Sequence, residues 1–141
     1  MPDPTDPPPA DPTLDLVALG DEPYLSLTTY RRSGVPVPTP VWAACDGDRL
    51  VVWTGADSGK VKRLRHTSRV TIAPCDVRGR LHGDPVPASA RVLDAAEMDR
   101  VGAALTRKYG WKFRGSVLGA RLGRLVGIRR VGQVGIEIVL D

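Results

Sequence analysis

The sequence predicts a mainly β fold with a few helices, built as a small barrel of about six antiparallel strands. Three observations predict it. Short β-branched and apolar segments recur along the chain, tight polar turns join the early ones, and helical periodicity is confined to a few segments. The expected order is helix, three strands, short helix, two strands, a longer helical region and a last strand. Hairpin-joined strands with helices in two crossovers are typical of small barrels.

The strands are expected at residues 24–30, 35–45, 49–54, 69–74, 86–93 and 133–140. The turn Asp46-Gly47-Asp48 joins the second strand to the third as a hairpin. Prolines stand at three alternate positions of the second strand, 36, 38 and 40. Because proline has no backbone N–H, one side of this strand cannot pair in a sheet over that stretch.

The helices are expected at residues 14–19, after the loop that begins at residue 56, at 94–108, and, as helix or irregular structure, at 116–126. Gly20 ends the first helix, and Asp57 or Ser58 is the N-cap of the second. Asp94 followed by Glu97 has the spacing of a capping box at the start of the third.

The chain has 141 residues, of which 42% are apolar and 26% charged, which is an ordinary composition for one globular domain. Residues 1–12 hold six of the 13 prolines and three aspartates. Such a segment cannot bury enough apolar surface to order itself. The sequence therefore predicts a disordered tail over residues 1–13 and one folded domain over 14–141.

Composition excludes several classes of protein. No stretch approaches the roughly 20 consecutive apolar residues of a membrane helix, and no secretory leader is present, so we expect a cytoplasmic protein. Cys45 and Cys75 are too few and too far apart in sequence for a disulfide scaffold, and with two histidines no metal site is expected. Neither a GxGxxG fingerprint nor a P-loop motif occurs.

Charge is segregated along the chain. Residues 1–23 carry six acids and no lysine or arginine, whereas residues 100–136 carry nine basic residues and no acid. A folded part this basic indicates an anionic partner, which is a nucleic acid, a phosphorylated cofactor or an acidic surface. The alternative interpretation is a solvated basic face.

A candidate phosphate site follows the third strand, where the loop 55–59 leads into the basic run Lys60-Val61-Lys62-Arg63-Leu64-Arg65. The first N–H groups of a helix are free to bind an anion, and a lysine in the first turn is unfavourable unless an anion is bound. At helical spacing either Lys60 and Arg63, or Lys62 and Arg65, lie within one turn. The alternative is an ordinary surface helix.

The order and spacing of these segments resemble the split β-barrel superfamily of pyridoxamine-phosphate oxidases, and within it the branch that uses the deazaflavin coenzyme F420. The resemblance runs from about residue 24 to 93. It rests on residues 34–42 (Gly-Val-Pro-Val-Pro-Thr-Pro-Val-Trp), 46–48, 53–54, 58–65 and 69–74. It covers about half the chain well and the rest in outline.

The resemblance implies a homodimer with two cofactor sites at the interface. It implies that one strand lies along the flat ring of the cofactor, and this strand comprises Thr39, Pro40, Val41, Trp42 and Ala43. Trp53 and Thr54 would lie near the ring or the ribityl chain. The phosphate would be bound by Ser58, Gly59 and Lys60, assisted by Lys62 or Arg65.

The resemblance also bears on the cofactor. In the flavin-binding oxidases a basic residue of the first hairpin strand helps to hold the phosphate, and its position here is Ala43. This departure favours coenzyme F420 over FMN. The acid-free stretch 100–136 suits the anionic tail of that coenzyme.

The function expected is that of a reductase in which reduced coenzyme F420 passes a hydride to a small conjugated organic substrate. His66, His82 and Tyr109 are candidates for a proton donor, and no catalytic side chain is assigned. The alternatives are a barrel that binds FMN or heme, and a non-enzymatic barrel that binds nucleic acid. The last is disfavoured because Tyr24, Trp42 and Trp53 fall in the apolar pattern of predicted strands rather than among exposed basic residues.

Overall fold

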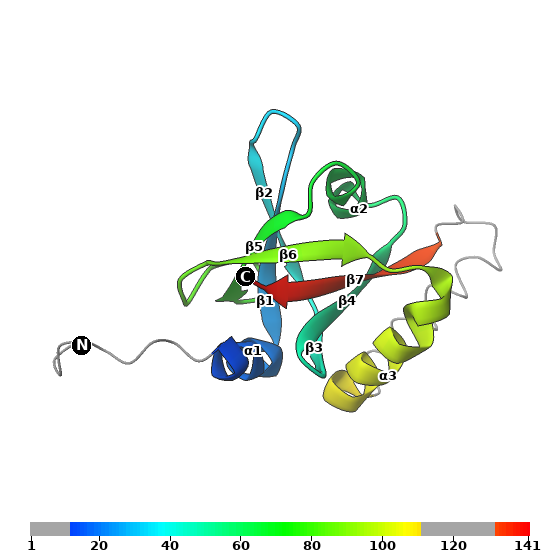
Figure 1. Cartoon of the computed structure of the whole chain (residues 1–141). Helices are drawn as coiled ribbons and strands as arrows, with labels where there is room; N and C mark the ends of the chain where they lie inside the picture. The colour runs from blue at the N-terminus through cyan, green and yellow to red at the C-terminus, as the bar shows by residue number, and fades with distance from the viewer. Residues whose placement is uncertain (1–11, 111–131) are drawn as a thin grey trace, which may run out of the picture.

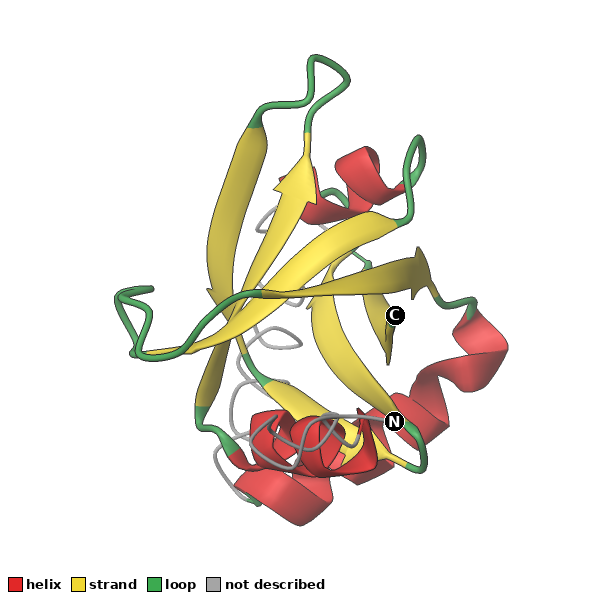
Figure 2. Cartoon of the chain, turned by 60° about the vertical axis from the view of Figure 1, so that its left-hand side comes forward, coloured by secondary structure: helices red, strands yellow, loops and turns green. Residues whose placement is uncertain are grey.

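The computed structural model describes residues 12–110 and 132–141. Seven strands form one antiparallel sheet in the order β2-β1-β5-β6-β7-β4-β3. The strands are β1 (Tyr24–Tyr30), β2 (Pro36–Val41), β3 (Ala43–Asp46), β4 (Arg49–Gly55), β5 (Arg69–Cys75), β6 (Val86–Val92) and β7 (Gln133–Leu140). The helices are α1 (Pro12–Asp21), α2 (Gly59–Leu64), the 3₁₀ turn η1 (Ala95–Glu97) and α3 (Met98–Tyr109). The sheet is strongly curled into a half-barrel, with α1 and α3 at the end opposite α2 (Figures 1 and 2). The mainly β barrel predicted from the sequence is confirmed.

The strand predicted over residues 35–45 is in fact two strands, which raises the count to seven. The chain leaves β2 at Val41, passes through Trp42 and enters β3 at Ala43. β2 pairs only with β1, at one edge of the sheet, whereas β3 pairs with β4 at the other edge. The sheet therefore curls until its two edges meet at Trp42. A local sequence pattern does not show that the chain crosses there from one edge of the sheet to the other.

The proline-bearing strand is an edge strand, as its sequence predicts. Pro36, Pro38 and Pro40 lie opposite Tyr30, Thr28 and Ser26 of β1. Ladder hydrogen bonds to β1 must come from the residues between the prolines, because only those have an N–H. The carbonyl groups of the three prolines consequently point away from β1.

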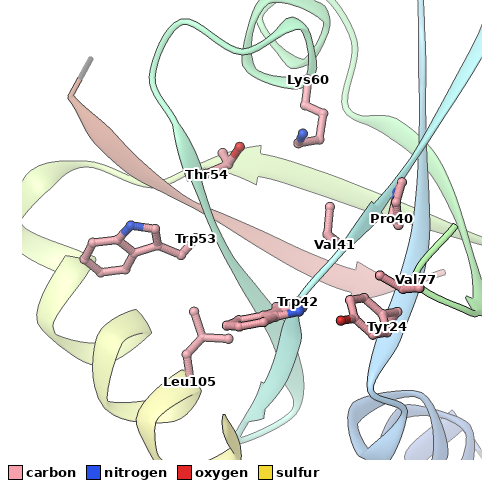
Figure 3. Close-up of a pocket in the computed structure, with 9 residues that line it drawn as sticks. All are labelled: Tyr24, Pro40, Val41, Trp42, Trp53, Thr54, Lys60, Val77 and Leu105. Carbon is pink, nitrogen blue, oxygen red and sulfur yellow. The ribbon is translucent and has the colours of Figure 1, made fainter. Parts of the chain in front are cut away.

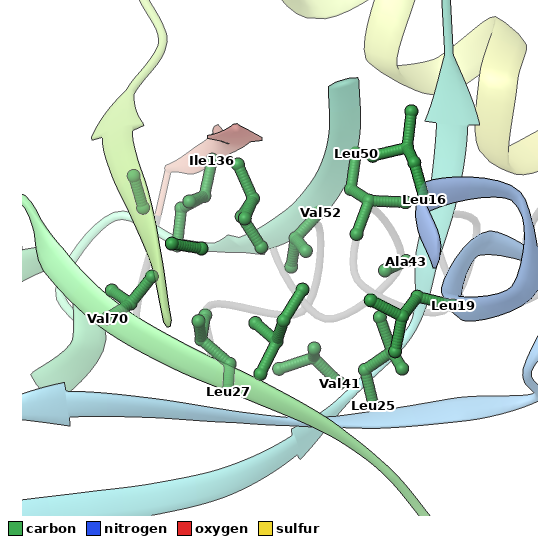
Figure 4. Close-up of a cluster of buried hydrophobic side chains, with 14 of the residues drawn as sticks. Leu16, Leu19, Leu25, Leu27, Val41, Ala43, Leu50, Val52, Val70 and Ile136 are labelled. Atoms are coloured by element: carbon green, nitrogen blue, oxygen red, sulfur yellow. The ribbon is translucent and has the colours of Figure 1, made fainter. Parts of the chain in front are cut away.

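The main core fills the inside of the curled sheet. Alternate residues of the strands point inward, and α1 closes one end with Leu16 and Leu19 (Figure 4). The core includes Leu25, Leu27, Val41, Ala43, Leu50, Val52, Val70, Ile72, Ile136 and Ile138. Burial of this apolar surface is the main source of stability.

A second cluster lies on the outer face, where α3 packs against β3 and β4. It comprises Ala44, Val51, Leu93, Val101, Ala104 and Leu105, with Trp42, Trp53 and Tyr109 at its margin. Gly135 of β7 allows the helix to approach, because a Cβ there would lie 2.9 Å from Cγ2 of Val101. The helix that the sequence predicts before the last strand is therefore α3, and it packs on the outer face of the barrel.

Ion pairs hold the start of α3 to the sheet. Glu137 of β7 is only 3% exposed and pairs with Arg49 of β4 and Arg91 of β6. Arg91 also pairs with Glu97, and Arg100 of α3 pairs with Asp46 of β3 at 2.6 Å. A buried carboxylate is tolerated only where cations of this kind compensate the loss of water.

Two local expectations need correction or refinement. The capping box at Asp94 is wrong, because its side chain makes no capping hydrogen bond and the chain forms η1 before α3 begins at Met98. Of the two candidate N-caps of α2, Ser58 is the one used. The first helix begins at Pro12, and proline is well suited to a first helical turn. The segment 116–126 lies outside the described residues.

Candidate functional site

A pocket of about 360 Å³ opens between the end of β2, the strand β4 and the start of α2 (Figure 3). It is lined by Tyr24, Pro40, Val41, Trp42, Trp53, Thr54, Lys60, Val77 and Leu105. Six of these residues belong to the cofactor site expected from the sequence, from Pro40 to Trp42 together with Trp53, Thr54 and Lys60. The structure thus brings two sequence segments together at one cavity.

One wall of the pocket is formed by the end of β2 and by Trp42. The indole ring of Trp42 is stacked on the ring of Tyr109, with centroids 4.7 Å apart and an angle of 12° between the planes. Leu105 of α3 lies next to Trp42 in the same wall (Figure 3). This wall is flat and largely apolar, and it suits a planar ring system.

The opposite end of the pocket carries a positive charge on Lys60. Ser58 caps α2 by accepting a hydrogen bond from the N–H of Val61 at 3.4 Å, and Thr54 Oγ1 lies 3.4 Å from Ser58 Oγ. These contacts fix the start of α2, from which Lys60 extends toward the cavity (Figure 3). Burial, followed by the neighbouring Arg63, lowers the pKa of Lys60 below its ordinary value. Both causes disfavour the charged ammonium, so an anion nearby would stabilise it.

Arg63 lies beside Lys60; the sequence named it as the helical partner of Lys60, but the resemblance gave the assisting role to Lys62 or Arg65. Its Nε donates to Oγ1 of Thr29 at 2.6 Å. Its guanidinium also covers Gly59, where an added Cβ would lie 2.6 Å from one terminal nitrogen. Burial and the charge of Arg31 lower the pKa of Arg63. Of the two pairs that helical spacing allows, only Lys60 of the first pair lines the pocket, and Arg63 lies beside it outside the lining.

The remaining predicted residues lie outside the pocket lining. Lys62 of α2 and Arg65, the C-cap of this helix, are both exposed. Thr39 is half-buried and donates to the carbonyl of Leu27 at 3.4 Å. Ala43 is fully buried in the core. Ser58 and Gly59 shape the loop beneath Lys60.

Three lining residues were missed by the sequence analysis, namely Tyr24, Val77 and Leu105. Val77 lies in the loop after β5, where Oδ1 of Asp76 accepts the N–H groups of Arg78 and Arg80, both at 2.9 Å. Val77 is nevertheless 61% exposed, so it borders the mouth of the pocket. The sequence around Asp76 could have predicted the turn. No local sequence pattern, however, predicts that this loop lies near β2.

None of the candidate proton donors is placed to act in the pocket. His66 is half-buried and His82 is exposed, and neither lines the cavity. The hydroxyl of Tyr109 accepts the N–H of Ala43 at 3.2 Å and donates to the carbonyl of Pro23 at 2.9 Å. Burial raises the pKa of Tyr109 to about 12, so the hydroxyl keeps its proton.

Over residues 12–110 and 132–141, no three His, Cys, Asp or Glu side chains come together as a set that could hold a metal ion. No helix in the same two ranges is both long and apolar enough to cross a membrane.

An antiparallel sheet curled into a half-barrel, with a pocket between its two edges, defines the class of split β-barrel proteins. Sequence comparison gives the family: the family model described as pyridoxamine 5'-phosphate oxidase matches residues 16–134. The chain belongs to this family. None of the curated proteins matches the chain in sequence.

Solved structures share the fold at low sequence identity. A conserved hypothetical protein, Rv2991 of Mycobacterium tuberculosis, is 20% identical over 100% of this chain and 86% of its own, with a TM-score of 0.65. The heme storage protein HutZ of Vibrio cholerae is 13% identical over 94% and 92%, with a TM-score of 0.62. ChuZ of Campylobacter jejuni is 11% identical over 91% and 51%, with a TM-score of 0.64. At these identities the likeness concerns the fold alone.

Proposed function

We propose that this protein is an oxidoreductase that binds coenzyme F420 in the pocket and transfers a hydride between the reduced coenzyme and a small conjugated organic molecule. The observation that carries the proposal is the pocket itself. A flat wall formed by Pro40 and Trp42 faces an end occupied by the half-buried ammonium of Lys60. A ligand that fits both ends combines a planar ring with an anionic group.

The residues at the cationic end fit a phosphate. The charge of Arg63 adds to burial in lowering the pKa of Lys60, and the first turn of α2 has no acid. Because Gly59 has no side chain, the guanidinium of Arg63 can lie over it. A side chain at position 59 would displace that guanidinium. Charge-assisted hydrogen bonds to phosphate are among the strongest that a protein makes.

The other residues have simpler tasks in this proposal. Trp42 and Pro40 would lie against the ring, and Trp53 and Thr54 would border the chain that links ring to phosphate. The carbonyl of Pro40, which points away from β1, would accept a hydrogen bond from a ring N–H. The bound deazaflavin would supply the hydride chemistry.

Position 43 supports coenzyme F420 over FMN. Flavin-binding oxidases that this sequence resembles have a basic residue there, whereas Ala43 is fully buried in the core and offers no charge. A heme protein is the second candidate, because HutZ, described as a heme storage protein, shares the fold. Against it, none of the nine described residues that line the pocket is histidine, cysteine or methionine.

A homodimer belongs to the same proposal. The pocket is open, and Val77 at its mouth is 61% exposed although it lines the cavity. A second copy of the chain would cover this opening. Light scattering behind size-exclusion chromatography would give twice the monomer mass, and a monomer that still binds the coenzyme would contradict this part.

Fluorescence titration with coenzyme F420, with FMN and hemin in parallel at the same ionic strength, tests the proposal. We expect the deazaflavin to bind most tightly. Lys60→Ala should weaken it by about 1–3 kcal/mol, roughly five- to 150-fold in Kd. Lys62→Ala is the matched control, since it removes the same charge from the exposed face of the same helix. Tighter binding of FMN or hemin, or equal effects of the two lysine variants, would overturn the proposal.

A further inference from the structure

The last turn of α3 lies directly behind the pocket wall. Leu105, Lys108 and Tyr109 are spaced so that they share one side of the helix. Leu105 lines the cavity, and the other two side chains reach the point where the chain crosses from β2 to β3. The proposed function gives Lys108 and Tyr109 no role.

Both side chains bind backbone at this crossing and just before β1. Lys108 Nζ donates to the carbonyls of Glu22 and Ala43, each at 2.5 Å. Tyr109 Oη accepts the N–H of Ala43 and donates to the carbonyl of Pro23. Both polar backbone groups of Ala43 are therefore held by α3, and the link before β1 is tied to the link after β2.

The ring of Tyr109 supports Trp42 from behind. Trp42 lies between two strands, and no ladder pair includes it. Its indole is stacked on the phenol ring with centroids 4.7 Å apart, while Trp42 also lines the pocket. Lys108 Nζ lies 4.8 Å from the centroid of the same phenol ring and faces it. The orientation of the pocket wall thus depends on Tyr109.

We propose that Tyr109 is a positioning residue of the pocket, which fixes Trp42 so that a flat, conjugated ring of a bound ligand can lie against it. Its ring fixes the indole, and this contact carries the positioning role; its hydroxyl, which binds the backbone at Ala43, contributes to stability. Tyr109 acts through Trp42 and does not exchange a proton with the ligand. The identity of the ligand rests on the proposed function, but the orientation of Trp42 without ligand does not.

Two substitutions separate the ring from the hydroxyl. Tyr109→Met fills similar space with a flexible chain that has no flat face, whereas Tyr109→Phe keeps the ring and loses the hydroxyl. Tyr30→Phe is the matched control, because the ring of Tyr30 lies under Arg69 instead of under a tryptophan. Trp42→Phe identifies the part of the near-ultraviolet circular dichroism spectrum that belongs to Trp42.

We expect Tyr109→Met to lose the dichroism band of Trp42 in the absence of ligand and to bind coenzyme F420 about two- to twelvefold more weakly, the value of one aromatic pair. Tyr109→Phe and Tyr30→Phe should keep the band and the affinity. If Tyr109→Met lowers the unfolding midpoint but leaves the band and the affinity of the folded protein unchanged, the proposal is wrong.

The two proposals fail in distinguishable ways. If the unmutated protein binds neither coenzyme F420 nor FMN, the proposed function is overturned, and the dichroism band alone decides the role of Tyr109. Loss of the band in Tyr109→Met then supports positioning, and its retention refutes it. Tyr109→Leu gives the same readouts if the methionine variant does not fold.

Discussion

A methyl group added at Gly20 tests how α1 packs against β3. Gly20 lies in α1, and a Cβ there would collide with Sγ of Cys45 on β3 and lie 3.4 Å from Cδ2 of Leu50. Overpacking of this kind costs roughly 1–3 kcal/mol. Alanine in place of glycine in a helix returns about 1 kcal/mol. Gly20→Ala should therefore destabilise the protein by up to about 2 kcal/mol.

The effect of Gly20→Ala on stability should reverse when the sulfur of Cys45 is absent. In a Cys45→Ala background the collision is removed, so Gly20→Ala should stabilise the fold by about 0.5–1 kcal/mol. The coupling energy between the two positions is then about 1–3 kcal/mol. Gly102→Ala is the matched control, because a Cβ at Gly102 of α3 meets only Trp53, at an ordinary 3.5 Å. It should stabilise the protein in either background.

Urea unfolding of the four variants of the cycle measures this coupling. With a denaturant slope of about 1–3 kcal/mol per molar, the expected changes shift the midpoint by tenths of a molar or more. A coupling below about 0.5 kcal/mol, which is within the additivity of independent sites, would show that α1 does not pack on β3 as described.

Three further predictions concern the site and its surroundings. Ser58→Ala should lower the free energy of unfolding by about 1 kcal/mol, because the N-cap bond to α2 is lost, and urea unfolding measures it. Leu105→Ala should cost roughly 2–5 kcal/mol, since this side chain is fully buried; a loss under 1 kcal/mol would contradict the packing of α3. Burial raises the pKa of Tyr109 from 10.0 to about 12, so the folded state favours the protonated phenol. The stability this contributes is complete below about pH 10 and is lost as the pH rises to 12, and Tyr109→Phe should unfold with a smaller dependence on pH in that window.

Local patterns predicted most elements because each obeys a local rule. The strand at 24–30 and the strand at 133–140 coincide with β1 and β7. The three alternate prolines correctly predicted an edge strand. The division at Trp42 was missed, because apolar and β-favouring residues run through it without a turn signal. What divides the strand is pairing with two distant partners, β1 and β4.

The site was predicted in part for the same reason. Lys60 and the N-cap at Ser58 follow from local helix rules, and the structure has Lys60 in the pocket lining and Ser58 as the N-cap of α2. Which of the neighbouring cations faces the pocket depends on how α2 docks. Val61 and Leu64 are buried against the sheet, and this turns Arg63 toward Thr29. Val77 and Leu105 reach the cavity only through the tertiary fold.

The two edges of the sheet are protected from self-association by different means. β3 is four residues long and is covered by α1 and α3. Within residues 12–110 and 132–141 no strand pairs with the outer side of β2, and a strand from another molecule would find acceptors there and, at three alternate positions, no donor. Such a strand could form only half of a ladder. The three prolines thus keep this edge from serving as a template for aggregation, and replacing them with valine or threonine would remove that protection.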